Sequence, residues 1–190
     1  MNKRLQKPFT ALYPAPVTLV TCGGGEVRPN IITIAWAANL CSKPPMIGLG
    51  MRPGRYSHGL IKESGEFVVN IPRPEMIEVC DRCGTVSGRE VDKFAEFGLT
   101  PLPASQVRAP LIAECPVNIE CRVRQIVPLG SHDLFIGEVV AVHLDEDCLD
   151  EQGRFDSARV GGLVYDATIR YWNLGRIVGN YGYTAREKTR

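Results

Sequence analysis

The sequence predicts a mainly β protein, a β-barrel with short helices and Greek-key links. Glycine (19 residues) and proline (14 residues) are both frequent. They separate short runs rich in valine, isoleucine, threonine and tyrosine, and this pattern favours strands over long helices. A sheet built from so many short strands has to protect its edges, which closure into a barrel achieves.

The predicted strands follow the apolar runs between these breaks. The segment GGGEVRPN is a turn between the second and third strands, and PLGS makes a hairpin between two long strands. In chain order the predicted strands are Phe9–Tyr13, Val17–Cys22, Asn30–Leu40, Met46–Met51, Phe67–Ile71, Val117–Val127, His132–Leu144 and Val160–Trp172.

Three short helices are expected between the strands. In RYSHGLIKESG, Ser57 can cap a helix that stops at Gly65 in the left-handed conformation. In PEMIEVCDRCG, Pro74 suits the first turn of a helix and Gly84 its exit. The third helix lies in REVDKFAEFG and ends at Gly98.

Length and charge narrow the class of protein. A chain of 190 residues is expected to form one domain over residues 1–190, with a core at about 9–175 and a solvated tail at 184–190. Lysine and arginine (22) nearly balance aspartate and glutamate (21), so no basic footprint for nucleic acid is present. No signal peptide is recognisable, and no apolar run reaches the roughly 20 residues of a membrane helix. We therefore expect a cytoplasmic protein.

The seven cysteines are an odd set, which favours reduced thiols. Cys80 and Cys83 form CDRC and would share one face of a helix. Inert buried thiols are the favoured interpretation, because the pair lies at a helix end where the dipole does not stabilise a thiolate. A redox dithiol, or half of a zinc site completed by Cys115 and Cys121, stays open. The acidic segment 145–156 lacks EF-hand spacing and is interpreted as a solvated loop, so no metal site is predicted.

The apolar segment Asn30–Leu40 carries an amide, Asn30, and an indole, Trp36, whose places on so apolar a strand need an explanation. Residues at even spacing share one face of a strand, so Asn30 and Trp36 would look the same way, about 20 Å apart at 3.3 Å per residue. That span matches an extended nucleotide or a site shared between two subunits. The alternative is that Trp36 fills the barrel core and Asn30 caps the preceding turn.

An ordered set of sequence blocks identifies a resemblance. NIITIAW, SKPPMIGLGMRPGRYSHGLI, EFVVNIP, SGREVDKF, GSHDLFIGEV and GGLVY follow one another over about 9–175. In this order and spacing they resemble the flavin reductase-like, FMN-binding split-barrel family, and within it the flavoredoxin group. The resemblance implies a homodimer of split barrels that holds FMN without a covalent bond near the subunit interface.

The same resemblance implies a set of cofactor-binding residues. Asn30 and Trp36 would touch the flavin or its ribityl chain, and the double proline would end the strand beside the ring. Ser57 and Lys93 would bind the phosphate, whereas His132 and Tyr165 would approach the flavin from later strands. The full implied set is Asn30, Ala35, Trp36, Ala37, Ala38, Arg52, Arg55, Ser57, Lys93, His132 and Tyr165.

Elementary chemistry supports the phosphate assignment. A helix start beside Arg52 and Arg55 offers N–H groups, a dipole end and guanidinium forks to a phosphate. Without the resemblance, however, Ser57 is explained as a plain N-cap and Lys93 as a surface lysine. His132 is equally explained as a turn residue, and Tyr165 as a core residue.

The resemblance implies a flavoprotein oxidoreductase that takes electrons from NAD(P)H or a redox partner protein. The electrons would pass to free flavin, ferric iron or a protein acceptor. No GxGxxG motif follows a strand, so NAD(P)H is expected only as a transient donor. The alternatives are a non-catalytic FMN-binding electron carrier and, more distantly, a zinc-stabilised β-barrel that binds a partner protein.

Overall fold

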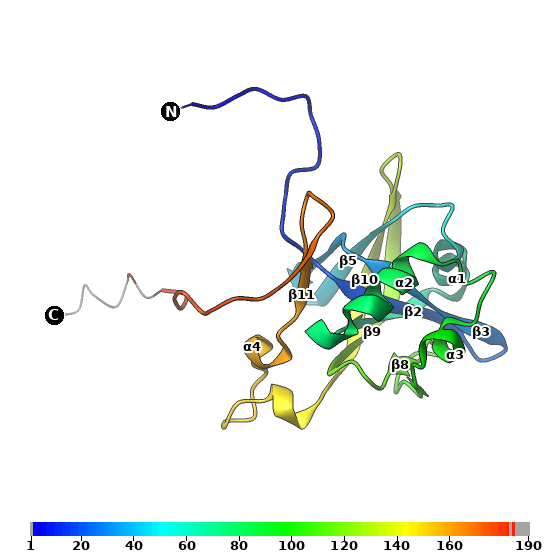
Figure 1. Ribbon diagram of the computed structural model, residues 1–190. Coiled ribbons are helices and arrows are strands. Elements are labelled where there is room, and N and C mark those ends of the chain that lie inside the picture. The colour runs from blue at the N-terminus through cyan, green and yellow to red at the C-terminus, as the bar shows by residue number, and fades with distance from the viewer. Residues whose placement is uncertain (1, 183, 185–190) are drawn as a thin grey trace.

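A computed structural model describes residues 2–182 and 184, and its main element is a seven-stranded antiparallel sheet in the order β3-β2-β6-β9-β10-β5-β4 (Figure 1). The first and last strands in this order follow each other in the chain. Ile32 and Ile34 of β3 share a core with Ile47 and Leu49 of β5, so the sheet wraps into a barrel. Its strands are β2 Thr18–Gly24, β3 Val27–Ile34, β4 Ala37–Ser42, β5 Pro45–Met51, β6 Glu66–Ile71, β9 Val117–Pro128 and β10 Asp133–Leu144.

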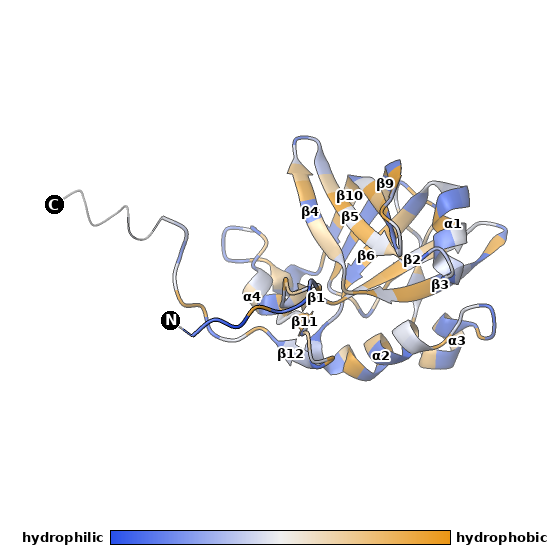
Figure 2. Ribbon diagram, turned by 90° about the horizontal axis from the view of Figure 1, so that it is seen from above, coloured by the Kyte–Doolittle hydropathy of each residue, from blue (hydrophilic) through white to orange (hydrophobic). Residues whose placement is uncertain are grey.

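Smaller elements cover the barrel. The α-helices are α1 Tyr56–Ser64, α2 Ile77–Thr85, α3 Lys93–Phe97 and α4 Ser157–Val160, with 3-10 turns η1 Pro74–Met76 and η2 Glu146–Cys148. A three-stranded sheet joins β1 Ala15–Pro16, β11 Leu163–Tyr165 and β12 Tyr171–Asn173, and a second pairs β7 Pro101–Leu102 with β8 Leu111–Ile112. Figure 2 shows α2 and α3 along one flank of the barrel, against β3.

The barrel strands are apolar on both faces where a helix covers them. On β2, Val20 points into the barrel with Phe67 and Phe135. Its neighbour Leu19 points the other way, into a second core that includes Cys80 and Phe94 from α2 and α3. Because successive side chains of a strand alternate, a strand buried on both faces reads as an unbroken apolar run.

The predicted mainly β fold is confirmed, and most element boundaries agree within a few residues. The hairpin at PLGS joins β9 to β10, and Gly65 and Gly98 end α1 and α3 with φ of 69° and 64°. No helix within residues 2–182 and 184 is long and apolar enough to cross a membrane.

Three predicted strands are wrong. Phe9–Tyr13 forms no strand, and only Ala15–Pro16 of that region pairs, with β11. The ribbon Asn30–Leu40 is interrupted at Ala35 and Trp36, because the backbone leaves β3 there and enters β4 on the opposite edge of the sheet.

The predicted strand Val160–Trp172 is replaced by α4 and the hairpin of β11 and β12. Asp156 caps α4 by accepting a hydrogen bond from the Ala158 N–H, and Gly161 ends it with φ of 69°. Asp166 then accepts hydrogen bonds from the Thr168 and Arg170 N–H groups, which folds the chain back into the hairpin.

Two helix assignments also need correction. Arg55, not Ser57, is the N-cap of α1, and Ser57 lies inside the first turn. Gly84 lies within α2, which continues to Thr85 and ends in the extended residue Val86.

Candidate functional site

An open cleft of about 320 Å³ lies where the chain crosses between the two edge strands of the barrel. Its floor includes Ala35, Trp36 and Gly50, and the Gly50 N–H donates to the Trp36 carbonyl at 2.8 Å. A Cβ at position 50 would lie 3.3 Å from the Trp36 Cβ. Glycine therefore lets the crossing segment lie directly against β5.

Aromatic side chains wall the open cleft. Trp36 is 42% exposed, and its ring stacks on His132 with centroids 4.3 Å apart and planes tilted by 35°. The Ser131 hydroxyl lies 2.9 Å from His132 Nδ1. Burial and the charge of Arg52 lower the pKa of His132, which favours the neutral ring. Tyr165 reaches the same cleft from β11.

A small cavity of about 90 Å³ adjoins the open cleft, and Arg55 and Gly84 line both. Its polar wall is made by Asn30 and Ser57, which are 3% and 1% exposed. Asn30 Nδ2 donates to Ser57 Oγ at 2.7 Å. This bond fixes the Ser57 hydroxyl at the first turn of α1, where backbone N–H groups and the helix dipole favour an anion.

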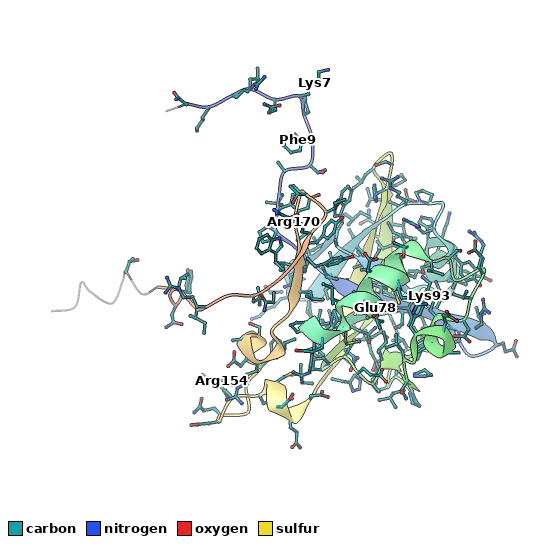
Figure 3. All side chains as sticks on the ribbon, viewed as in Figure 1. Lys7, Phe9, Glu78, Lys93, Arg154 and Arg170 are labelled. Carbon is teal, nitrogen blue, oxygen red and sulfur yellow. The ribbon has the colours of Figure 1, made fainter. Side chains whose placement is uncertain are left out.

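Lys93 is a buried cation at the small cavity. It is 2% exposed, and Nζ donates to the Ile31 and Cys83 carbonyls at 2.7 Å each. Figure 3 places Lys93 within the body of the molecule, unlike Lys7 on the extended N-terminal segment. An ammonium has three donors, so one remains for a ligand. Burial lowers the pKa of Lys93. The interpretation of Lys93 as a surface lysine is wrong.

The turn between α2 and α3 completes the small cavity, and the sequence analysis missed it. Ser87, Gly88 and Arg89 line the cavity, and Arg28 Nη2 donates to the Gly88 carbonyl at 2.6 Å. A Cβ on Gly88 would collide with the Asn30 amide, so only glycine fits there. The glycine in SGRE was the available signal, because a glycine between two helices marks a tight turn or a close approach.

The structure brings the sequence-predicted residues to three adjoining places. Ala35, Trp36, Arg52, Arg55, His132 and Tyr165 line the open cleft, and Asn30, Arg55, Ser57 and Lys93 line the small cavity. Ala37 and Ala38 line neither. With Trp36 and Leu40 they line an apolar cavity of about 410 Å³ next to the open cleft.

Four subsidiary expectations about the segment Asn30–Pro45 are wrong. Trp36 does not fill the barrel core, and Asn30 does not share its face, because the strand breaks between them. Asn30 bonds Ser57 rather than capping a turn. The double proline Pro44–Pro45 does not end the strand beside the cleft, since it forms the turn at the other end of the β4–β5 hairpin.

The cysteine pair is buried in the second core. Burial raises the pKa of Cys80 to about 12 and that of Cys83 to about 11, so both are protonated thiols at neutral pH. Cys115 lies in the same core, but Cys121 lies inside the barrel, so the proposed zinc set is not assembled. Within residues 2–182 and 184, no cluster of three or more histidine, cysteine or acidic side chains could hold a metal.

The site fits a long ligand with an anionic group at one end and a flat ring at the other. The small cavity offers a hydroxyl, an ammonium donor and a helix start, with Arg55 at its mouth. The open cleft offers aromatic faces and a glycine-lined floor. The two ends differ in chemistry because one neutralises charge and the other contacts an apolar ring.

Comparisons with known proteins show which family and fold the chain shares. The model of the flavin reductase like domain matches residues 10–169. Flavoredoxin of Desulfovibrio vulgaris (Miyazaki F) is 34% identical with a TM-score of 0.90, covering 97% of this chain and 100% of that one. Flavoredoxin from Methanosarcina acetivorans is 30% identical with a TM-score of 0.88, covering 98% and 99%. An FMN-binding protein from Thermus thermophilus, solved with bound 1-cyclohex-2-enone, is 27% identical with a TM-score of 0.79, covering 95% and 99%.

Proposed function

The chain belongs to the flavin reductase-like domain family, and on this basis we propose that it is an FMN-binding flavoprotein oxidoreductase. The observation that supports FMN is that the small cavity, which is rich in hydrogen-bond donors, adjoins the open cleft, which has aromatic walls. A cavity of about 90 Å³ suits a terminal phosphate better than the adenylate of FAD. The cofactor would be held without a covalent bond.

Different residues would bind the phosphate in the small cavity and the ring in the open cleft. Ser57 and Lys93 would donate hydrogen bonds to the phosphate, and Arg55 would add positive charge. Trp36 and His132 would contact the ring, and Arg52 and Tyr165 would lie at its rim. The redox chemistry itself would come from the flavin.

The electron donor and acceptor are part of the same proposal. NAD(P)H would bind transiently at the open cleft, since the sequence carries no GxGxxG motif for a dedicated dinucleotide site. Electrons would leave to free flavin, ferric iron or a redox partner protein. A second candidate function, an electron carrier without its own turnover of nicotinamide, is favoured by the similarity to two flavoredoxins.

We further propose a homodimer in which the cleft lies near the subunit interface. Two exposed apolar features support this proposal. The apolar cavity beside Trp36 is lined by the exposed side chain of Leu40 and by Tyr13 of the N-terminal segment. Leu12 on that segment is 95% exposed, and Figure 1 shows the segment leaving the barrel.

We also propose that the protein acts in the cytoplasm, because its seven free cysteines fit a reducing compartment.

Titration of the cofactor-free protein with FMN, FAD and riboflavin tests the proposal. We expect FMN to bind most tightly and riboflavin, which lacks the phosphate, at least tenfold more weakly. Anaerobic mixing of the FMN-loaded protein with NADH and NADPH then separates the candidates. Loss of the flavin absorbance supports the reductase, whereas unchanged absorbance supports the carrier. A protein that binds none of the three flavins would overturn both.

A further inference from the structure

A histidine–carboxylate pair connects the two ends of the site, and the proposed function leaves it without a role. His58 Nε2 lies 2.8 Å from Asp133 Oδ2, and the two side chains are 8% and 18% exposed. His58 follows Ser57 in the first turn of α1. Asp133 follows His132 at the start of β10. The pair therefore links the element that carries Ser57 to the element that carries His132.

The strand side of the link is oriented by alternation. Asp133 and Phe135 share one face of β10, and the His58 and Phe135 rings are nearly perpendicular, at 82°, with centroids 4.9 Å apart. Leu134 lies on the other face and lines the apolar cavity, and His132, which directly precedes β10, stacks on Trp36 beside that cavity. Because His132 is the chain neighbour of Asp133, holding Asp133 in place restricts how His132 is presented to the open cleft.

The helix side of the link has a matching geometry. Successive residues of an α-helix point about 100° apart, so the first turn of α1 can bond on two sides. Ser57 accepts from Asn30 at the small cavity, and His58 bonds Asp133 on β10. The first turn of α1 is thereby held between the small cavity and the start of β10.

We propose that His58 and Asp133 are positioning residues, which set the separation between Ser57 and His132 so that both ends of one FMN are met at once. This inference rests on the proposed function. It implies that the pair matters for a ligand that engages both ends and matters little for a ligand that engages the ring end alone. A role in stability alone has no such dependence on the ligand.

A second pair of the same chemistry provides a matched control. His143 Nε2 lies 2.6 Å from Glu120 Oε1, which also accepts from the Ser105 N–H and hydroxyl. Glu120 Oε2 accepts from the Gln106 and Val107 N–H groups, so the carboxylate keeps four donors without His143. Neither His143 nor Glu120 lines the open cleft, the small cavity or the apolar cavity.

The test compares FMN with riboflavin in single variants, by quenching of flavin fluorescence. His58→Phe keeps a ring against Phe135 but donates no hydrogen bond, and we expect its FMN affinity to fall about tenfold. Its riboflavin affinity should stay within about twofold. His58→Gln, whose amide can donate to Asp133, should restore FMN affinity to within about threefold of wild type, and His143→Phe should leave both affinities unchanged.

Clear outcomes would overturn the positioning role. Equal losses for FMN and riboflavin in His58→Phe, or no loss for either, would do so, as would failure of His58→Gln to restore FMN binding. If His58→Phe does not fold, the double variant with Asp133→Leu, which leaves no carboxylate without its donor, is measured against the same expectations. A wild-type protein that binds neither compound would instead overturn the proposed function.

Discussion

The two ends of the site are built differently. At the small cavity, Asn30, Ser57 and Lys93 are buried and already hydrogen-bonded to the protein. At the open cleft, Trp36 is 42% exposed and is held by stacking on His132. Under the proposed function, the buried end would retain FMN and the exposed end would leave its reactive ring accessible.

Replacing Lys93 with methionine should break this contrast most strongly. Methionine fills the space but leaves the Ile31 and Cys83 carbonyls without their donor. We expect the free energy of unfolding to fall by about 1 to 3 kcal/mol and FMN binding to weaken by about 1.5 to 3 kcal/mol. Denaturant titration and fluorescence titration measure the two. Lys62→Met, at the exposed end of α1, is the control and should change neither.

The lowered pKa of Lys93 adds a pH dependence. Because the folded-state pKa lies below the ordinary value of 10.5, the native protein loses this proton before the unfolded chain does. FMN affinity should therefore fall on the alkaline side before pH 10.5. In the same window the contribution of Lys93 to stability rises with pH, because the unfolded chain binds more protons. Lys93→Arg, which stays charged, should keep a flat FMN affinity through this range.

Ser57→Ala should produce the next largest effect, confined to ligands with a phosphate. It removes the hydroxyl that Asn30 holds at the helix start. We expect FMN binding to weaken by about 1 to 3 kcal/mol while riboflavin binding stays unchanged. Ser64→Ala, at the other end of α1, is the matched control. Equal losses for both ligands would place the phosphate somewhere else.

Trp36→Ala tests the open cleft, where we expect a modest loss of binding that is the same for FMN and riboflavin. Because the side chain is largely outside the core, the melting temperature should change little, whereas FMN and riboflavin should both bind about 0.5 to 1.5 kcal/mol more weakly. Trp172→Ala, on an indole that is 52% exposed on β12, is the control. A large fall in melting temperature would contradict the peripheral place of Trp36.

The smallest effect is expected from the thiols. Only Cys41 of the seven cysteines is exposed, and burial raises the pKa of most others well above neutral. Native protein should take up one equivalent of iodoacetamide at pH 8, and Cys41→Ser should abolish this uptake without altering FMN affinity. Rapid labelling of Cys80 or Cys83 would revive the redox-dithiol interpretation.

Local signals in the sequence predicted most of the fold. Alternating apolar runs and the PLGS turn located β9 and β10, and glycines located the ends of α1 and α3. The break at Ala35 and Trp36 was not predictable from periodicity, because the partner on the far edge of the sheet is chosen by tertiary pairing. The strand predicted across 160–172 does not form, because the helix cap made by Asp156 and the turn held by Asp166 outweigh the β propensity of the segment.

The candidate site was predicted unevenly for a similar reason. The resemblance to the family identified residues that line the open cleft or the small cavity in the structure, including Ser57, Lys93 and His132. It did not identify the Ser87–Arg89 turn, or the pairing of His58 with Asp133, whose 75-residue separation leaves no mark in a single sequence. Contacts that only the folded chain creates cannot be read from spacing along it.

The ammonium of Lys93 has a consequence for how quickly the cofactor could be taken up. Its bonds to the last turn of α2 and to the middle of β3 exist without any ligand, so the walls of the small cavity are tied together in advance. Little conformational freedom would then be surrendered on association. Protein stripped of its cofactor should regain full occupancy on simple mixing, and its exchange rate should be governed by departure rather than entry.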